Sequence, residues 1–175
     1  AIPPVCPASA ALQPGGYPVG GESFAIGHDC TAMTPGMASA SWSHFPHDAD
    51  IGVVGMGPTK AEAFRQAGLA LTAVITDPAG IRPVEAVEVT CRAPSDDLLL
   101  LEWLDALIYE MGVRGMVFGD YTVTIEGDEL RAIALGEPVE QARHQPAVEI
   151  KGATFTALAV EKRPDGWRVQ CVVDV

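Results

Sequence analysis

Apolar and polar residues first follow a helical period in residues 61–75. Apolar side chains recur there every three or four positions, which places them on one face of a helix. Thr59 and Glu62 stand three residues apart and form a capping box, in which each side chain binds a free backbone N–H group. Pro78 and Gly80 follow the pattern, so we predict a helix over residues 61–75 that ends in a turn.

A second helical segment begins after Ser95 and is apolar on nearly all sides through Tyr109. Ser95 is a favoured N-cap residue, and Asp96 and Asp97 place negative charge in the first turn, where the helix dipole favours it. A helix that is apolar all round is buried in a protein core. We therefore predict a central, buried helix that ends at Gly112.

The other apolar positions follow the two-residue period of β-strands. Two short strands are predicted before the first helix, one between the helices, and a hairpin with two further strands after the second helix (residues 41–45, 51–57, 84–91, 117–125, 130–135, 148–162 and 167–175). A loop over residues 136–146 carries Glu137, Glu140, Arg143 and His144. This order predicts an α+β fold, with two helices packed on a mostly antiparallel or mixed sheet.

Residues 1–40 differ from the rest of the chain in composition. They are rich in Pro, Gly, Ala and Ser, contain no Lys or Arg, and show neither period. We predict an irregular extension over residues 1–40 and one folded domain over residues 41–175. A docking or chaperone-like role of the extension is an alternative, which deletion of residues 1–40 tests.

The charge of the chain restricts its classes of partner. The 175 residues include 11 Lys and Arg against 23 Asp and Glu, a formal net charge of −12, so direct nucleic-acid binding is not expected. Such a surface suits metal ions or a basic partner protein. No apolar run reaches the roughly 20 residues of a membrane span, and the first residues lack a signal-peptide pattern. The four cysteines form no CxxC pair, so we expect free thiols in a reducing, cytoplasmic compartment.

The densest group of chemically active residues lies in residues 44–52. Asp48 and Asp50 are two positions apart, so on an extended strand both carboxylates point to one face, while His47 points to the other. A hard cation needs a third oxygen donor, and Asp174, at the end of an apolar strand, is the candidate. The alternative is a turn in which the Asp side chains bind nearby backbone groups.

Familiar catalytic motifs are absent from the sequence. It contains neither a GxSxG elbow nor a phosphate-binding GxxxxGK[ST] loop, and its histidines are too dispersed for a zinc site. One enzymatic hypothesis is a small metal-dependent phosphoester hydrolase that uses His47, Asp48 and Asp50. Glu149 and Lys151 share one face of a predicted strand, either as a solvated ion pair or as a polar patch beside the metal site or a partner.

The segment His47-Asp-Ala-Asp-Ile-Gly52 resembles the archease signature His-Thr-Ala-Asp-Ile-Gly. Further matches to that family follow in the same order: Glu62-Ala-Phe64, Leu99 to Leu104, Gly115-Met-Val-Phe118, Gly136-Glu137, Arg143-His144, Glu149-x-Lys151-x-x-Thr154 and Asp174-Val175. The resemblance covers residues 41–175. Two places depart from the family pattern: Asp48 stands where the family has Thr, and Thr154-Phe-Thr156 lacks the hydroxyl and imidazole of the family's Thr-Tyr-His.

The resemblance implies an accessory protein and not an enzyme. Archeases activate the RtcB-type RNA ligase of tRNA splicing and RNA repair, by promoting formation of its guanylated histidine and multiple turnover. The implied ligands of a divalent cation, calcium with magnesium or manganese as alternatives, are Asp50, Asp174 and Val175, with Asp48 and His47 as further candidates. Glu149 and Lys151 match charged residues that serve activation of the ligase in the family.

Overall fold

The computed structural model describes residues 39–175, so the extension predicted over residues 1–40 lies almost entirely outside the described range. The α+β prediction is confirmed. The elements in chain order are β1 Ser41–His47, β2 Asp50–Gly57, α1 Lys60–Ile75, a 3₁₀ turn Pro78–Gly80, β3 Glu85–Arg92, α2 Asp96–Arg114, β4 Met116–Glu126, β5 Glu129–Pro138, α3 Gln141–His144, β6 Gly152–Ala153, β7 Ala159–Arg163 and β8 Gly166–Asp174.

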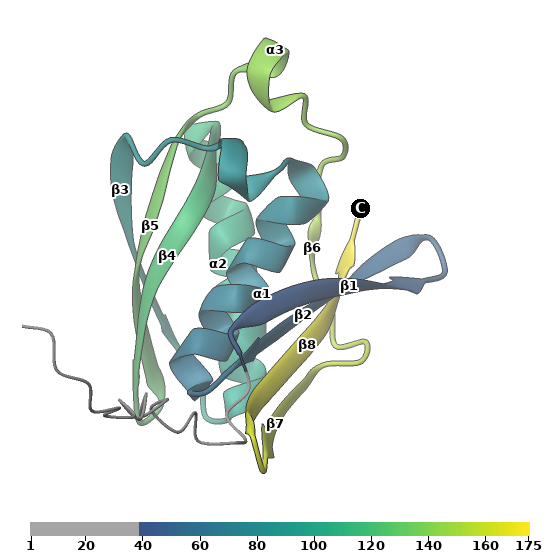
Figure 1. The fold of residues 1–175 in the computed structure, drawn as a ribbon, viewed down its shortest axis with the longest axis vertical. Coiled ribbons are helices and arrows are strands. Elements are labelled where there is room, and N and C mark those ends of the chain that lie inside the picture. Colours follow the sequence, from purple (N-terminus) through teal and green to yellow (C-terminus); the bar gives the residue numbers. More distant parts are fainter. Residues whose placement is uncertain (1–38) are drawn as a thin grey trace, which may run out of the picture. The chain divides into compact units, whose positions relative to one another are not determined.

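The two long helices, α1 and α2, lie between two sheets (Figure 1). One sheet has the strand order β1-β2-β8-β6, and β7 also pairs with β8; the other has the order β3-β5-β4. Every strand pairing is antiparallel. The helices can therefore bury apolar residues against a sheet on either side, which explains why α2 is apolar nearly all round.

The core lies where α1 and α2 meet the two sheets. Phe64, Trp103 and Tyr121 are at most 2% exposed. Trp103 Nε1 donates to the carbonyl oxygen of Phe64 at 3.1 Å, and the Thr72 and Tyr121 hydroxyl groups share a hydrogen bond of 2.7 Å. Because these bonds satisfy polar atoms that are buried with the rings, the aromatic side chains fix α1, α2 and β4 in one arrangement.

The strand β2 lies directly against the backbone of α1. A Cβ atom at Gly55 would be 2.1 Å from the carbonyl oxygen of Ala63 and 2.5 Å from the amide nitrogen of Ala67. Only a glycine permits such an approach. Gly55 therefore sets the distance between α1 and the strand that begins at Asp50.

The predicted end of the second helix is wrong. Helix α2 continues through Gly112 to Arg114 and ends at Gly115, which has a left-handed backbone (φ 61°) and donates its N–H to the carbonyl oxygen of Met111. Gly115 is the better stop because the terminating position needs a positive φ, which Gly112 does not adopt. No helix in residues 39–175 is long and apolar enough to span a membrane.

The chain after β5 also departs from the prediction. The predicted loop over residues 136–146 contains the end of β5 and the helix α3, and the predicted strand over residues 148–162 is divided into β6 and β7. Between β6 and β7, Ala157 adopts a φ of 51°, and the Thr154 hydroxyl accepts from the Thr156 N–H at 3.2 Å. This turn lacks Gly and Pro, the residues that signal a turn in sequence.

We expect Gly55→Ala and Gly112→Ala to change stability in opposite directions. The methyl group added at Gly55 collides with α1, which should lower the free energy of unfolding by about 1–3 kcal/mol or more. At Gly112 no heavy atom lies within 4 Å of the added Cβ. There the higher helix propensity of Ala should raise the free energy of unfolding by about 0.5–1 kcal/mol. Urea denaturation measures both; a stabilised Gly55→Ala variant would contradict the close packing of β2 on α1.

Candidate metal centre

The stretch that joins β1 to β2 is a two-residue turn. His47 pairs with Asp50, and Asp48 and Ala49 form the turn between them. Asp48 is exposed and has a φ of 49°, a left-handed conformation that Asp tolerates better than most residues. The prediction that Asp48 and Asp50 share a strand face, with His47 opposite, is therefore wrong. Because directly paired residues project to the same side, His47 and Asp50 share a face instead.

The register of β2 and β8 places the two candidate acids at the same end of the sheet. The pairing of the two strands ends with Ile51 opposite Val173, and Asp50 and Asp174 are the residues that follow these partners outward. Asp174 pairs on its other side with Gly152 of β6. Both acids are half-buried. Two carboxylates from segments more than a hundred residues apart in sequence thus lie beside the last paired positions of two neighbouring strands.

Lys151 lies beside this pair of acids. Its ammonium group donates to a main-chain oxygen of Val175 at 2.9 Å and is 3.5 Å from Asp174 Oδ1. The backbone N–H of Lys151 also donates to the Asp174 carbonyl oxygen at 2.9 Å, next to the pairing of Gly152 with Asp174. Lys151 is thus not paired with Glu149: it places a positive charge against two of the three predicted cation ligands.

Two acidic side chains of α2 hold the chain that follows Lys151. Asp105 Oδ1 accepts from the Ala153 N–H, and Asp97 Oδ1 accepts from the Val160 N–H, each at 2.7 Å. Sequence reasoning missed both roles, because an acid on a helix is ordinarily a solvated residue. They fix β6 and β7 on the helix and so determine where Lys151 lies relative to β8.

The two histidines near the turn have different surroundings. His44 Nε2 forms a hydrogen bond of 2.7 Å with the Ala70 carbonyl oxygen of α1 and is a structural group. His47 Nδ1 is buried without a hydrogen-bond partner in the described part of the chain. Within residues 39–175, no three His, Cys, Asp or Glu side chains are placed to hold a metal ion. His47, Asp48 and Asp50 therefore do not form the metal cluster that the hydrolase hypothesis needs.

A second charged cluster surrounds Glu137 at the end of β5. Its side chain is 2% exposed and accepts from the Arg82 backbone N–H at 2.7 Å and from Arg82 Nε at 2.9 Å. Arg143 Nη2 approaches the same carboxylate to 2.6 Å. His144 Nδ1 accepts from the Glu140 N–H at 2.9 Å, so its Nε2 carries a proton and donates to Glu137 at 3.3 Å.

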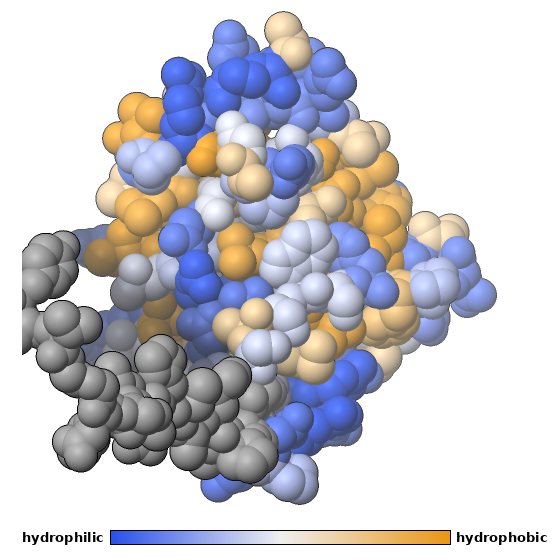
Figure 2. All heavy atoms as spheres, in the orientation of Figure 1, coloured by the Kyte–Doolittle hydropathy of each residue, from blue (hydrophilic) through white to orange (hydrophobic). Residues whose placement is uncertain are grey.

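The Glu137 cluster fixes α3 and the irregular chain that leads from α3 to Lys151. The Ala147 N–H donates to the Ile75 carbonyl oxygen at 2.8 Å, and the Thr76 hydroxyl donates to the His144 carbonyl oxygen at 2.5 Å. In Figure 2 the surface at the top of the view, where Figure 1 places α3, is largely hydrophilic. Glu137, Arg143 and His144, which the sequence assigned to a loop, thus have a structural role.

Glu149 borders an apolar hollow of about 210 Å³. It lies between the C-terminal half of α2 and the chain that follows α3, and its lining residues are Ile75, Ile108, Met111, Gly112, Val139, Pro146, Val148, Glu149 and Ile150. The neighbouring Tyr109 and Val113 are 64% and 66% exposed. Glu149 is exposed and makes no ion pair with any residue in the described range.

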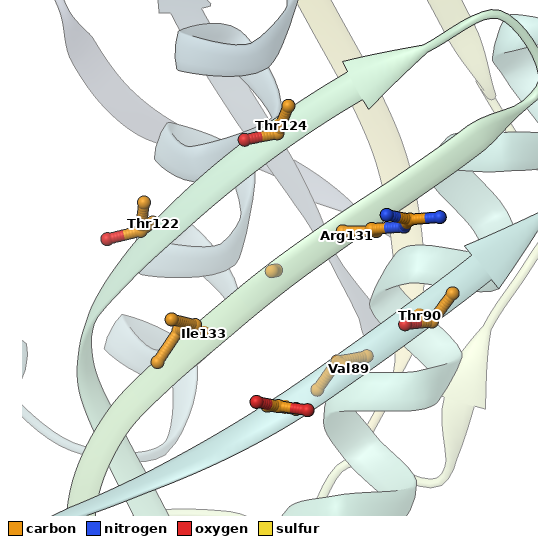
Figure 3. A pocket seen from close by; sticks show the side chains of 8 residues that line it. Val89, Thr90, Thr122, Thr124, Arg131 and Ile133 are labelled. Atoms are coloured by element: carbon orange, nitrogen blue, oxygen red, sulfur yellow. The ribbon is translucent and has the colours of Figure 1, made fainter.

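Another hollow, of about 280 Å³, lies on the β3-β5-β4 sheet. Figure 3 shows Thr122 and Thr124 on β4, Arg131 and Ile133 on β5, and Thr90 on β3 around it. Threonines, one arginine, one glutamate and apolar residues line it, and these include no His, Cys or Lys. The hollow therefore lacks a nucleophile paired with a base.

Comparison with known proteins agrees with this architecture. The model of the Archease protein family (MTH1598/TM1083) matches residues 42–175. The archease of Pyrococcus furiosus is 39% identical over 142 residues, which cover 77% of this chain and 98% of that protein. The archease of Aeropyrum pernix is 30% identical over 144 residues, which cover 79% of this chain and all of that protein (100%).

Two solved structures have the same fold. The solution structure of Methanobacterium thermoautotrophicum protein 1598 has a TM-score of 0.65 at 23% identity and covers 77% of this chain and 99% of that one. The crystal structure of a Thermotoga maritima archease, described as a possible chaperone, has a TM-score of 0.54 at 22% identity and covers 75% and 94%. Two helices between antiparallel sheets define the archease fold. The match to the family model and the identity to known archeases show that this chain belongs to the archease family.

We expect the Glu137 cluster to make stability depend on pH. Burial raises the pKa of Glu137, but the hydrogen bonds from Arg143 and Arg82 outweigh it and hold the pKa well below its ordinary value. The ionised carboxylate therefore stabilises the fold above the unfolded-state pKa of about 4.3, and this contribution is lost as the pH falls toward the folded-state pKa. Glu137→Gln should be less stable than the wild type near neutral pH and should lose less stability on acidification.

Urea denaturation at a series of pH values from about pH 7 to about pH 3 measures this difference. Glu126→Gln, at an exposed position on the β4–β5 hairpin, is the matched control and should follow the wild type. Parallel pH profiles of the wild type and Glu137→Gln would contradict a stabilising role of the ionised Glu137.

Proposed function

We propose that this protein is a metal-binding accessory protein that activates an RtcB-type RNA ligase in tRNA splicing and RNA repair, without catalysing a reaction itself. Membership of the archease family supports the class of function. The observation that carries the proposal is the position of the Lys151 ammonium group at the end of β8, on oxygens of Asp174 and Val175. A cationic group thus already lies against two of the three ligands that the motif implies, and the third, Asp50, begins the strand that pairs with β8.

The donor set fits a hard divalent cation. Two carboxylates and a main-chain oxygen are the oxygen ligands that calcium prefers, and magnesium or manganese accept them too. Asp50, Asp174 and Val175 would hold the ion. Water would complete its coordination. A bound ion supplies positive charge that attracts phosphate oxygens.

Asp48 is placed to act on such a site through its charge. It is exposed in the turn two residues before Asp50 and carries a negative charge where the family motif has a neutral Thr. It would attract cations to the turn without binding them in the centre. This role is electrostatic and therefore weakens with added salt.

The charge of the chain supports a protein partner. A net charge of −12 opposes direct contact with RNA and favours encounter with a basic ligase surface. The apolar hollow beside Glu149 adds a surface on which a partner side chain can be buried. The ligase would thus meet Glu149 and Lys151 on one stretch of chain, with Asp174 and Val175 beside Lys151. The proposed location of this complex is the cytoplasm.

The test is a reconstituted ligation reaction. A cognate RtcB-type ligase with RNA ends, GTP and metal should guanylylate faster and turn over repeatedly when this protein is added at substoichiometric amounts. Asp50→Asn and Asp174→Asn should reduce that stimulation by about tenfold or more. Loss of a group that merely hydrogen-bonds to a metal ligand commonly lowers metal affinity by about tenfold, and these variants remove a charged ligand itself. Guanylylation is measured by transfer of labelled GMP to the ligase.

Asp165→Asn is the matched control for Asp174→Asn. Asp165 lies in the turn before β8, at the opposite end of that strand, and is exposed. The variant should stimulate the ligase as the wild type does. The proposal fails if the wild-type protein changes neither guanylylation nor turnover. It also fails if the protein alone processes the RNA ends.

A further inference from the structure

Lys151 contacts the same atoms that the proposed cation would bind. Its ammonium group is 2.9 Å from a main-chain oxygen of Val175 and 3.5 Å from Asp174 Oδ1. We infer that Lys151 is a built-in competitor of the metal ion: its ammonium group neutralises these oxygens in the metal-free protein and leaves them when a divalent cation binds. This inference rests on the proposed metal site and adds a residue that controls its affinity.

Displacement follows from distance and charge. A calcium ion lies about 2.3–2.6 Å from each ligand oxygen, whereas the ammonium group is already 2.9 Å from one of them. Both cations on the same oxygens would be close enough to repel each other strongly. The divalent ion has the larger charge and therefore binds these oxygens more strongly, so the ammonium group is the one that leaves.

The side chain of Lys151 is free to make this movement. It is 67% exposed, and the Asp174 side chain is 48% exposed, so the ammonium group can move into water at little cost. Within residues 39–175 it has no other hydrogen-bond acceptor. The backbone stays in place, because the Lys151 N–H is bound to Asp174 and the next strand is bound to Asp105. The change is therefore confined to one side chain.

Displacement links the metal to the partner surface. The released ammonium group lies next to the chain segment that carries Glu149 and borders the apolar hollow. It can then donate to an anionic group of the partner, such as a carboxylate or a nucleotide phosphate. Since linkage is reciprocal, an anionic group that holds Lys151 away from Val175 would in turn strengthen metal binding.

The experiment compares calcium affinities of the full chain by isothermal titration calorimetry with CaCl₂ alone. Because an exposed ion pair is weak, displacing it costs calcium binding only a few-fold in affinity, so we expect Lys151→Met to bind calcium about two- to fivefold more tightly than the wild type. Lys151→Arg keeps the charge and should stay near the wild type. Lys162→Met, at an exposed position of β7, is the matched control and should not change the affinity.

The outcomes separate this inference from the proposed function. Equal affinities of the wild type and Lys151→Met would overturn competition by Lys151 and leave the metal site standing. Weaker binding by Lys151→Met would also overturn it, because the lysine would then position ligands instead of competing. If neither protein binds calcium while both keep the wild-type circular dichroism spectrum, the metal site itself is refuted and the inference falls with it.

Discussion

The antiparallel pairing of β2 with β8 is the interaction on which the candidate site depends. One register runs from Gly57 opposite Trp167 to Ile51 opposite Val173, and Asp50 and Asp174 lie just beyond its last pair. A slip of one residue would reverse the face of every side chain in β8, Asp174 included. The register is held because alternate residues of β8, such as Val169 and Cys171, are completely buried against the helices. Packing of the core therefore determines the geometry of a site at the sheet's end.

The sequence predicted those parts of the fold in which local pattern and tertiary packing agree. The helix over residues 61–75, the α2 cap at Ser95 and the β4–β5 hairpin follow from period, caps and turn residues, and the structure confirms them. The division of the predicted strand over residues 148–162 could not be read in this way. Its cause is tertiary, because Asp97 and Asp105 of α2 bind the backbone of β7 and β6.

The candidate site was also predictable only in part, where a sequence motif or the strand pattern identifies its residues. Motif likeness selects Asp50 and Asp174, and the β-sheet register places them at the same end of two paired strands. The faces of Asp48 and His47 were misjudged, because a turn with a left-handed Asp48 looks in sequence like a continuing strand. The contact of Lys151 with Val175 was not predictable either. It depends on where β6 lies along β8, which hydrogen bonds from α2 determine.

The two charged clusters near β5 and β8 differ in burial. The buried cluster stabilises the fold, whereas the exposed one can exchange its partners. Glu137 is 2% exposed and meets two arginines, so removal of a partner leaves a buried charge and costs stability. Lys151 and Asp174 are 67% and 48% exposed, so water can replace either partner. An exposed lysine on a potential cation site is therefore easily displaced, while the buried Glu137 cluster keeps the surrounding backbone fixed. A site that exchanges one cation for another needs both properties: a rigid frame and a weakly held occupant.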